Sequence, residues 1–356
     1  MWREINKLLD RTYIVASVDF KRIRLVFAPG VVVSFSDRVE ELRVLSDLAR
    51  RGHSFPVVVF GPEGCGKTAL LRQMASLLRE EEIEVVYVDT LEEDVSRAVV
   101  ASPELRQAVV SFAEAAVGPL GKALAYAVIA VVSKILSKMK SDNLVIIVDE
   151  VFQAVGLENA AMYVKKALNL LEYPSDLNKR ALILLTTSEG VSRREVARHG
   201  WADIKEVWNL NYSGLRELYS QLPEPKPDYS QVWRITGGNP RILKQYYMRD
   251  WDTESLVQWL VVERNLRNEV AEIVKRHGKD VLVEGLENPD LLLKDYELYL
   301  ELEKLSLVID LHSRDYTGGW IGAAPSRDLE LGIGDRVAWQ TPLHKEAVRR
   351  IIQQLL

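Results

Sequence analysis

Short apolar runs recur between residues 57 and 210, and patterns typical of helices separate most of them. The runs are 57–60, 84–88, 144–148, 181–185 and 205–210, and each is rich in residues that favour strands. Runs of this length and composition are typical of strands that are buried on both faces of a sheet. Their alternation with helices predicts an α/β fold: a doubly wound, mainly parallel sheet with ligands at the carboxyl ends of its strands.

The two ends of the chain show other patterns. Residues 13–20 and 23–28 are rich in β-branched and aromatic side chains and flank a charged pair, which predicts a β-hairpin. After the last apolar run, three prolines punctuate a polar stretch, and the pattern is then helical to about residue 305. The tail mixes strand patterns with a final helix, so a further domain follows the sheet.

An apolar segment, residues 108–139, has the composition of a membrane span but is interrupted by charges and by Gly118-Pro119. Its longest uncharged stretch is shorter than the roughly 20 residues that a spanning helix needs. Because Pro119 suits the first turn of a helix, we expect two helices, about 104–117 and 119–139. We interpret them as a helical insertion, about 91–141, packed inside the domain; a surface for a partner or for self-association is the alternative.

The first apolar run ends in a phosphate-binding loop, Gly-Pro-Glu-Gly-Cys-Gly-Lys-Thr at residues 61–68, and a helical pattern follows. Its glycines let backbone N–H groups and the helix N-terminus surround a polyphosphate. Lys67 is expected to reach the β- and γ-phosphates, and the Thr68 hydroxyl to bind Mg²⁺. The predicted nucleotide-binding residues are Gly61, Pro62, Glu63, Gly64, Cys65, Gly66, Lys67, Thr68 and Ala69.

The run 144–148 ends in two carboxylates, Asp149 and Glu150. In nucleotide hydrolases an apolar strand with this ending is the partner of a phosphate loop. We expect Asp149 to hold Mg²⁺, directly or through water, and Glu150 to polarise the attacking water. Hydroxyl groups follow the next run, so Thr187 or Ser188 is a candidate sensor of the γ-phosphate; capping of the next helix is the alternative for Ser188.

Arginines follow on the next predicted helix, at Arg193, Arg194 and Arg198. An arginine offered to the γ-phosphate of a neighbouring subunit can accelerate hydrolysis ~10³- to 10⁵-fold. Arg193 and Arg194 are therefore candidates for such a finger, and a solvated helical face is the alternative.

Composition narrows the function classes. The chain has 356 residues, 47% of them apolar, which allows two or three domains with a core each. A net charge of −5 argues against a generally basic, nucleic-acid-coating surface, although it leaves room for a local patch. One cysteine and an N-terminus without an apolar leader lead us to expect a cytoplasmic protein that does not enter a membrane.

Three further segments occur together. They are Phe-Ser-Asp-Arg-Val-Glu-Glu-Leu at 35–42, Asp-Glu-Val-Phe-Gln at 149–153 and Gly-Gly-Asn-Pro at 237–240. In combination they resemble the archaeal ATPase family, a branch of the AAA+-related signal-transduction (STAND) P-loop NTPases. The second departs from the family's Asp-Glu-(aromatic)-Gln box by one extra residue before the aromatic. The resemblance spans about residues 35–250.

This resemblance implies an ATPase core, a helical lid and a C-terminal winged-helix domain. It implies that Pro240 lies against the base or ribose, that Arg241 lies near the γ-phosphate, and that ATP is preferred to GTP. The tail is compatible with a winged helix: a helix at 295–305, strands at 307–311 and 336–340, and a last helix after Thr341-Pro342. The expected domains are a β-hairpin extension (1–34), the ATPase core (35–212), the lid (213–264) and the winged-helix-like domain (265–356).

The leading hypothesis is a Mg²⁺-dependent ATPase that acts as a nucleotide-controlled switch, with ATP/ADP as ligand and a protein partner or a second copy still unidentified. A DNA-binding initiator or transcription regulator is the first alternative. It is weaker because acidic residues accompany Arg314, Arg327 and Arg336 in the tail. A scaffold that binds ATP without hydrolysing it is the third hypothesis.

Overall fold

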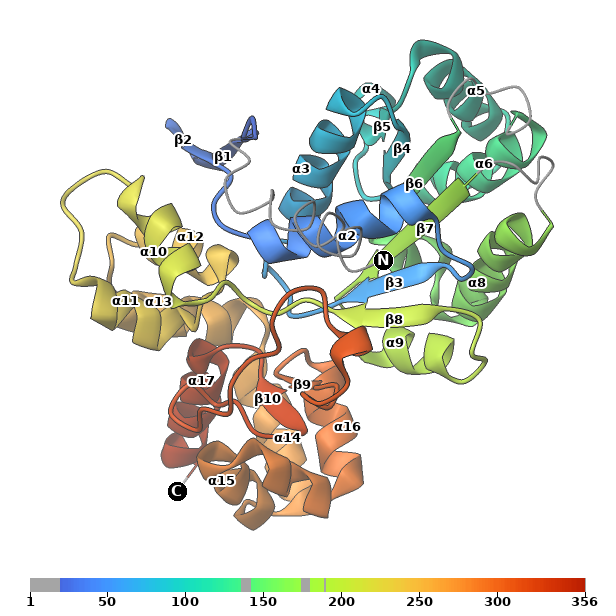
Figure 1. The fold of residues 1–356 in the computed structure, drawn as a ribbon. Helices are drawn as coiled ribbons and strands as arrows, with labels where there is room; N and C mark the ends of the chain where they lie inside the picture. Colours follow the sequence, from blue (N-terminus) through green and yellow to red (C-terminus); the bar gives the residue numbers. More distant parts are fainter. Residues whose placement is uncertain (1–19, 136–141, 174–179, 189, 356) are drawn as a thin grey trace, which may run out of the picture.

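The computed structural model describes residues 20–135, 142–173, 180–188 and 190–355 (Figure 1). Its centre is a six-stranded sheet with the strand order β5-β4-β6-β7-β3-β8. All neighbouring strands are parallel except β4 and the short edge strand β5. The predicted α/β class is confirmed. The strands are β3 (Val57–Phe60), β4 (Glu84–Asp89), β5 (Val99–Val100), β6 (Asn143–Asp149), β7 (Arg180–Thr187) and β8 (Asp203–Glu206).

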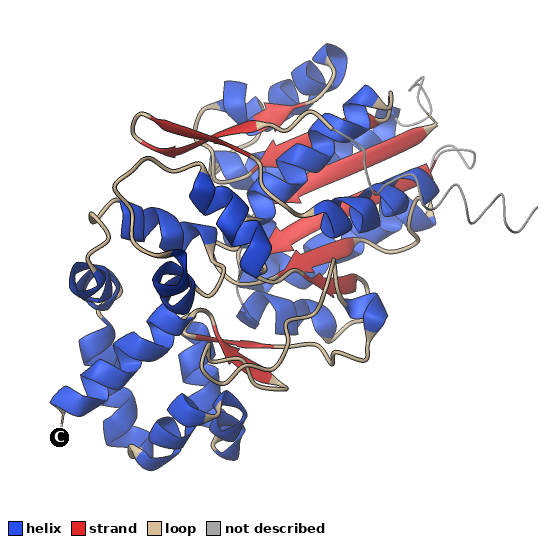
Figure 2. Ribbon diagram, turned by 60° about the vertical axis from the view of Figure 1, so that its left-hand side comes forward, coloured by secondary structure: helices blue, strands red, loops and turns tan. Residues whose placement is uncertain are grey.

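Alternate residues of the central strands β3, β4, β6 and β7 face different helical layers, which explains why these strands are largely apolar. In β3, Val57 and Val59 pack in one core with α2 (Val39–Arg51) and α3 (Lys67–Glu80). Val58 belongs to a second core with α8 (Leu157–Glu172) and the insertion helices. Figure 2 shows helices on both faces of the sheet.

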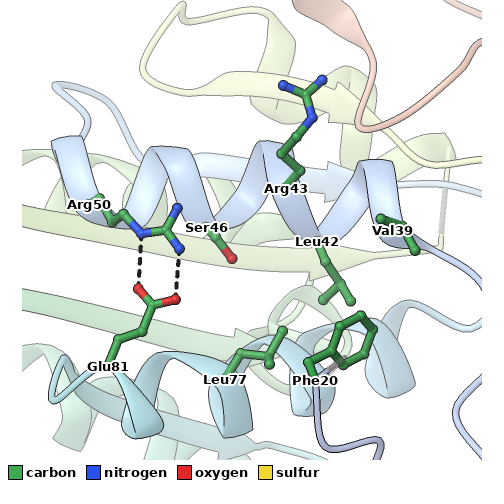
Figure 3. A pocket seen from close by; sticks show the side chains of 8 residues that line it. All are labelled: Phe20, Val39, Leu42, Arg43, Ser46, Arg50, Leu77 and Glu81. Atoms are coloured by element: carbon green, nitrogen blue, oxygen red, sulfur yellow. Dashed lines mark hydrogen bonds and ion pairs between the residues drawn. The ribbon is translucent and has the colours of Figure 1, made fainter. Parts of the chain in front are cut away.

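Helices α2 and α3 are also joined at the surface. Arg50 of α2 donates two hydrogen bonds to the carboxylate of Glu81, at the C-terminal end of α3, at 2.9 and 2.7 Å (Figure 3). Phe20 and Leu42 approach the same groove between the helices. This contact adds to the apolar core that α2 shares with α3, the helix that begins at the phosphate loop.

The last core strand differs from its prediction. The apolar run 205–210 predicts one strand, but β8 ends at Glu206. Beyond it Val207 still donates its N–H to Phe60 at 2.8 Å, and Leu210 donates to Gly238 at 3.0 Å. The second half of the run therefore crosses from the sheet to the lid, and its apolar residues are buried along that path.

The apolar segment forms the two predicted helices, α5 (Pro103–Glu114) and α6 (Leu120–Ile135), after the short α4 (Val95–Ala98). Residues 136–139 of the prediction lie outside the described residues. Leu124 and Val128 are buried, and the Tyr163 hydroxyl of α8 donates to the carbonyl of Ala125 at 2.8 Å. The pair is packed into the domain, and none of the helices in the described ranges is long and apolar enough to cross a membrane.

The described residues contain an N-terminal hairpin that the sequence did not predict. Strand β1 (Arg24–Ala28) pairs antiparallel with β2 (Val31–Ser34) through a turn at Gly30, whose φ of 74° favours glycine. The predicted pairing of 23–28 with 13–20 stays a prediction, because residues 13–19 lie outside the described residues. The sequence pattern does locate the first of the two strands.

The second half of the chain is largely helical, and one continuous apolar core joins α10 to α17 and includes Phe27 and Val33 of the hairpin. Strands β9 and β10 form an antiparallel pair. The elements are α10 (Tyr212–Ser220), α11 (Tyr229–Thr236), α12 (Pro240–Tyr247), α13 (Thr253–Glu263), α14 (Leu266–His277), α15 (Asp280–Glu287), η3 (Pro289–Lys294), α16 (Tyr296–Lys304), β9 (Val308–Asp310), η4 (Thr317–Gly319), β10 (Val337–Trp339) and α17 (Pro342–Gln354). We call α10–α13 the lid and residues 265–355 the C-terminal region.

Candidate nucleotide site

The phosphate loop connects β3 to α3, as its sequence predicts. Gly64 and Gly66 have φ values of 76° and 99°, a region that side chains disfavour. A Cβ on Gly61 would lie 2.1 Å from the carbonyl oxygen of Val207, so only glycine fits there. The loop's shape therefore depends on these three glycines.

Lys67 is the first residue of α3, and its side chain is buried beneath the loop. Its ammonium group donates hydrogen bonds to the carbonyls of Gly61 and Pro62, at 3.1 and 3.2 Å. Thr68 lines the adjoining cavity. Cys65 is fully buried in the loop, as a small apolar residue would be.

Asp149, at the end of β6, is held by two hydroxyl groups. The Tyr87 phenol donates to its Oδ2 at 2.7 Å, and Thr186 donates to its Oδ1 at 2.5 Å. Burial, together with the Asp149 charge, raises the pKa of Tyr87 above its ordinary value, so the phenol stays a donor. These contacts fix the orientation of a carboxylate that is itself buried.

Glu150 directly follows β6, at the point where the chain turns out of the sheet. Its φ of 51° lies in the left-handed region, and its N–H donates to Thr186 at 2.7 Å. Ser188 donates to its carboxylate at 3.3 Å. Of the two candidate sensors, Ser188 therefore lies beside Glu150, while Thr187 is buried in β7. The sequence interpretation missed Tyr87 and Thr186; the hydroxyl directly after the run 181–185 was the available signal for Thr186.

A cavity of about 350 Å³ adjoins the loop. Lys67, Thr68 and Glu150 line it from the core, Pro240 and Arg241 from the lid, as the family resemblance implies. Apolar residues of the hairpin complete the wall: Leu25, Val26, Phe27 and Val33, with Leu218 of α10. Figure 1 shows the hairpin between α3 and the lid helices. No pattern in the sequence indicates this role for the hairpin.

Glu63 ties the loop to the lid. Its carboxylate forms ion pairs with Arg241 of α12 and with Arg264, directly after α13. Burial opposes its charge, but Arg264 and Arg241 outweigh that effect and hold the pKa of Glu63 below its ordinary value. The Asn239 side chain, which also caps α12, donates to the Glu63 carbonyl at 2.9 Å. Three polar contacts thus join Glu63 to the lid and the residue that follows it.

A fourth polar contact of Glu63 comes from the C-terminal region. The N–H of Glu63 donates to the side-chain oxygen of Gln340 at 2.9 Å. The backbone oxygen of Gln340 accepts from Asn209 at 3.1 Å, and Asn209 accepts from Asn239 at 2.8 Å. One buried polar network therefore joins the phosphate loop, the lid and the C-terminal region.

Arg38 supports the loop from the other side. Its guanidinium donates to the carbonyls of Cys65 and Trp208, at 2.7 and 2.8 Å, and to Glu41 at 2.8 Å. The side chain is almost fully buried. Arg38 stands out in the sequence only as part of a motif, because the carbonyls that it binds cannot be inferred from residue types.

Arg193 does not have the exposed position expected of a finger for another subunit, and Arg194 is only partly exposed. Arg193 is 8% exposed and pairs with Glu206 at 3.0 Å and with Asp310 at 2.6 Å. Arg194 pairs with Glu303 of α16. Both side chains join the core to the C-terminal region of the same chain. Helix α9 (Gly190–Ala197) packs against α16. The buried position of Arg193 speaks against its predicted finger role, while Arg194, whose side chain is 31% exposed, stays a candidate.

Comparisons with known proteins show which family the chain belongs to. The chain can be superposed on the Aeropyrum pernix ORC2 protein, solved in ADPNP and ADP complexes, with 17% identity, 96% of this chain and 98% of that chain covered, and a TM-score of 0.45. The Aeropyrum pernix ORC1 protein in complex with DNA has 18% identity to this chain and a TM-score of 0.36, and the match covers 90% of this chain and 94% of that chain. A search of curated proteins returned no match. Residues 35–246 match the ATPase domain found predominantly in Archaea, and the chain belongs to this ATPase family.

Proposed function

We propose that this ATPase is a molecular switch, in which ATP binding and slow hydrolysis change how the lid and the C-terminal region are held against the phosphate loop. The observation that carries the proposal is the position of Glu63. This residue of the loop contacts Arg241, Arg264 and Gln340 at once. A change in the loop on binding a nucleotide would therefore act directly on both later parts of the chain.

The roles in nucleotide binding follow from the loop. Backbone N–H groups from Gly64 to Thr68 and the N-terminus of α3 would surround the phosphates. Lys67 would supply a positive charge to the β- and γ-phosphates. The apolar wall of Leu25, Phe27 and Leu218 suits the face of a purine base, with Pro240 against the base or ribose.

The residues present fit Mg²⁺. Within the described ranges no three His, Cys, Asp or Glu side chains gather into a metal site. Mg²⁺ needs none, since one or two carboxylates, a hydroxyl, substrate phosphates and water are its usual ligands. Thr68 and Asp149 would hold it, and the hydroxyls of Tyr87 and Thr186 already orient the carboxylate. The ion would neutralise charge on the phosphates during transfer.

Hydrolysis would depend on Glu150. Its carboxylate would orient and polarise the attacking water, and Ser188 would hold it in place. Thr187 stays a candidate sensor at the same strand end. An arginine from a second copy or a partner would add positive charge to this site. In the isolated chain, Arg193 and Arg194 form ion pairs with Glu206 and Glu303.

The C-terminal region offers little support for the DNA-binding alternative. Arg314 and Arg327 both pair with Asp335, at 2.8 and 3.2 Å. The two arginines share this one carboxylate, and Asp328 and Glu330 lie close to them in the sequence, so little net positive charge is left for the phosphates of a duplex. The pair β9–β10 with α14–α16 before it is compatible with a winged helix, which would serve contacts within the protein or with another protein.

Turnover of Mg-ATP, measured with ATP binding on the same samples, tests the proposal. Lys67→Ala should weaken binding and abolish turnover, since the phosphates lose their cation. Glu150→Gln should bind ATP as the wild type does but hydrolyse it at least 100-fold more slowly, a typical size for general-base loss. Tight binding without turnover in the wild type would overturn the hydrolysing switch and favour the scaffold.

A further inference from the structure

A second cavity, of about 650 Å³, lies beside the nucleotide site and is lined by more arginines. It is enclosed by β1, α3, β4 and the short elements α4 and β5. Four exposed arginines line it, and Glu92 is the one carboxylate among its described lining residues. The arginines are Arg24, Arg72, Arg79 and Arg97. We call this the arginine cavity.

Only two of these charges are neutralised by ion pairs. Arg72 pairs with Asp89 at 3.0 Å, and Arg97 pairs with Glu92 at 3.0 Å. Across the described part of the chain, Arg24 and Arg79 have no ion pair. Partial burial lowers the pKa of Arg79, which reflects an unfavourable environment for its charge. Because arginine keeps its proton, an anion is the partner that would relieve this environment.

The arginine cavity is also partly organised in advance. One guanidinium nitrogen of Arg79 donates to the carbonyl of Val100 at 2.9 Å, which holds the side chain at the cavity wall. Arg72 stacks over the ring of Tyr87, with 5.6 Å between guanidinium carbon and ring centroid. Arginines fixed in this way lose less conformational entropy when they bind a ligand.

We propose that the arginine cavity binds a small ligand that carries two or more phosphate groups. Planar guanidinium groups form paired hydrogen bonds with phosphate oxygens, and several arginines around one cavity suit several phosphates. The volume is in the range of sites for small molecules of nucleotide size. The ligand would occupy a site separate from the phosphate loop.

The ligand would also act on the nucleotide site through Arg72. This arginine lines both cavities. Its Nε donates to the Tyr87 hydroxyl at 3.3 Å, and that hydroxyl donates to Asp149 at 2.7 Å. A phosphate that draws Arg72 toward the arginine cavity would therefore alter how the Mg²⁺-binding carboxylate is held. This second step rests on the proposed function of Asp149.

Binding is tested first, by calorimetric titration of inorganic tripolyphosphate into the full chain saturated with Mg-AMP-PNP, which occupies the phosphate loop. We expect one tripolyphosphate per chain. The double variant Arg24→Gln/Arg79→Gln should bind it at least tenfold more weakly. The control Arg43→Gln/Arg267→Gln removes two exposed arginines elsewhere and should bind as the wild type does.

No binding to the wild type, or an equal loss in both double variants, would overturn the site. A 12-nucleotide single strand is titrated in parallel, and binding of that strand in place of tripolyphosphate would overturn the assignment to a small ligand.

The coupling has its own readout, kcat at saturating Mg-ATP with and without tripolyphosphate. We expect at least a twofold change in the wild type and none in Tyr87→Phe, which keeps the cavity but loses the hydroxyl. A change of equal size in Tyr87→Phe would overturn the route through Arg72. Because the first titration needs no hydrolysis, failure of the arginine cavity and failure of the proposed ATPase switch are distinguishable.

Discussion

The N–H of Glu63 donates to the side-chain oxygen of Gln340 across 277 residues of sequence, at 2.9 Å. Glu63 stands in the phosphate loop, and Gln340 follows β10 in the C-terminal region. Asn209 and Asn239 complete the network around this bond. The C-terminal region is therefore attached to the nucleotide site itself and not only to the outer face of the core.

Removing this attachment should weaken nucleotide binding. Gln340→Ala deletes the acceptor of a part-buried N–H, which costs about 1 kcal/mol, or about a fivefold rise in the Kd for ATP. The control is Gln353→Ala, an exposed glutamine near the end of α17. Equilibrium titration with a fluorescent ATP analogue measures both. An unchanged Kd in Gln340→Ala would mean that the bond does not support the loop.

Loss of Arg38 should have a larger effect. Arg38→Ala leaves the carbonyls of Cys65 and Trp208 without their donor, and each unpaired buried carbonyl costs about 1–3 kcal/mol. We expect a Kd for ATP at least tenfold higher and a lower midpoint of thermal unfolding. Arg43→Ala on the same helix, whose side chain pairs at the surface with Glu40, should change neither. Equal behaviour of the two variants would contradict this role.

Thr186 should separate binding from hydrolysis. Thr186→Val keeps the shape but removes the hydroxyl that donates to Asp149 and accepts from Glu150. Because the Asp149 carboxylate and the backbone of Glu150 lose their common support, we expect kcat to fall about tenfold or more, the scale of one misplaced catalytic group. ATP affinity without Mg²⁺ should stay within twofold. Steady-state turnover and titration of the same preparation decide the matter, and an unchanged kcat refutes the role.

Stability should fall in acid because of His344. Burial, followed by the charge of Arg264, lowers the pKa of His344 from its ordinary value of 6.5 to about 3. Between these values the unfolded chain binds a proton that the folded chain does not, so the free energy of unfolding falls as the pH drops. One such group contributes a slope of up to about 1.4 kcal/mol per pH unit.

Urea unfolding at pH 7, 6 and 5 measures that slope. His344→Asn should make it shallower, while His199→Asn, at an exposed site, should leave it as in the wild type. A slope that is equal in the wild type and His344→Asn would show that other groups cause the acid sensitivity.

The sheet and the phosphate loop were predictable because their signals are local. A buried parallel strand needs an apolar run, and the loop needs glycines at fixed spacing, so Val57–Phe60 and Gly61 to Thr68 identify themselves. The paired acids after β6 were equally clear. Confirmation of the fold class rests on these segments.

The contacts around the loop were not predictable, because they depend on which distant residues meet. Nothing near Arg38 in the sequence indicates the carbonyls of Cys65 and Trp208, and nothing near Gln340 indicates Glu63. The pairing of β1 with Val31–Ser34 was missed for a related reason, since β-branched residues lie on either side of β1 in the sequence and do not indicate which of them pair with it. Nothing near Arg193 in the sequence indicates its ion pairs with Glu206 and Asp310, which hold it in a buried position.

The most direct test of the switch is the distance between the core and the C-terminal region in different nucleotide states. Spin labels on Val117→Cys, between α5 and α6, and Val283→Cys, on α15, report it, since both positions are exposed and Cys65 is buried. In the Glu150→Gln background, Mg-ATP should shift the main distance by several ångström relative to ADP, as expected for a rigid-body rearrangement. Identical distance distributions with ATP, with ADP and without nucleotide would contradict the proposal that ATP controls the position of the C-terminal region.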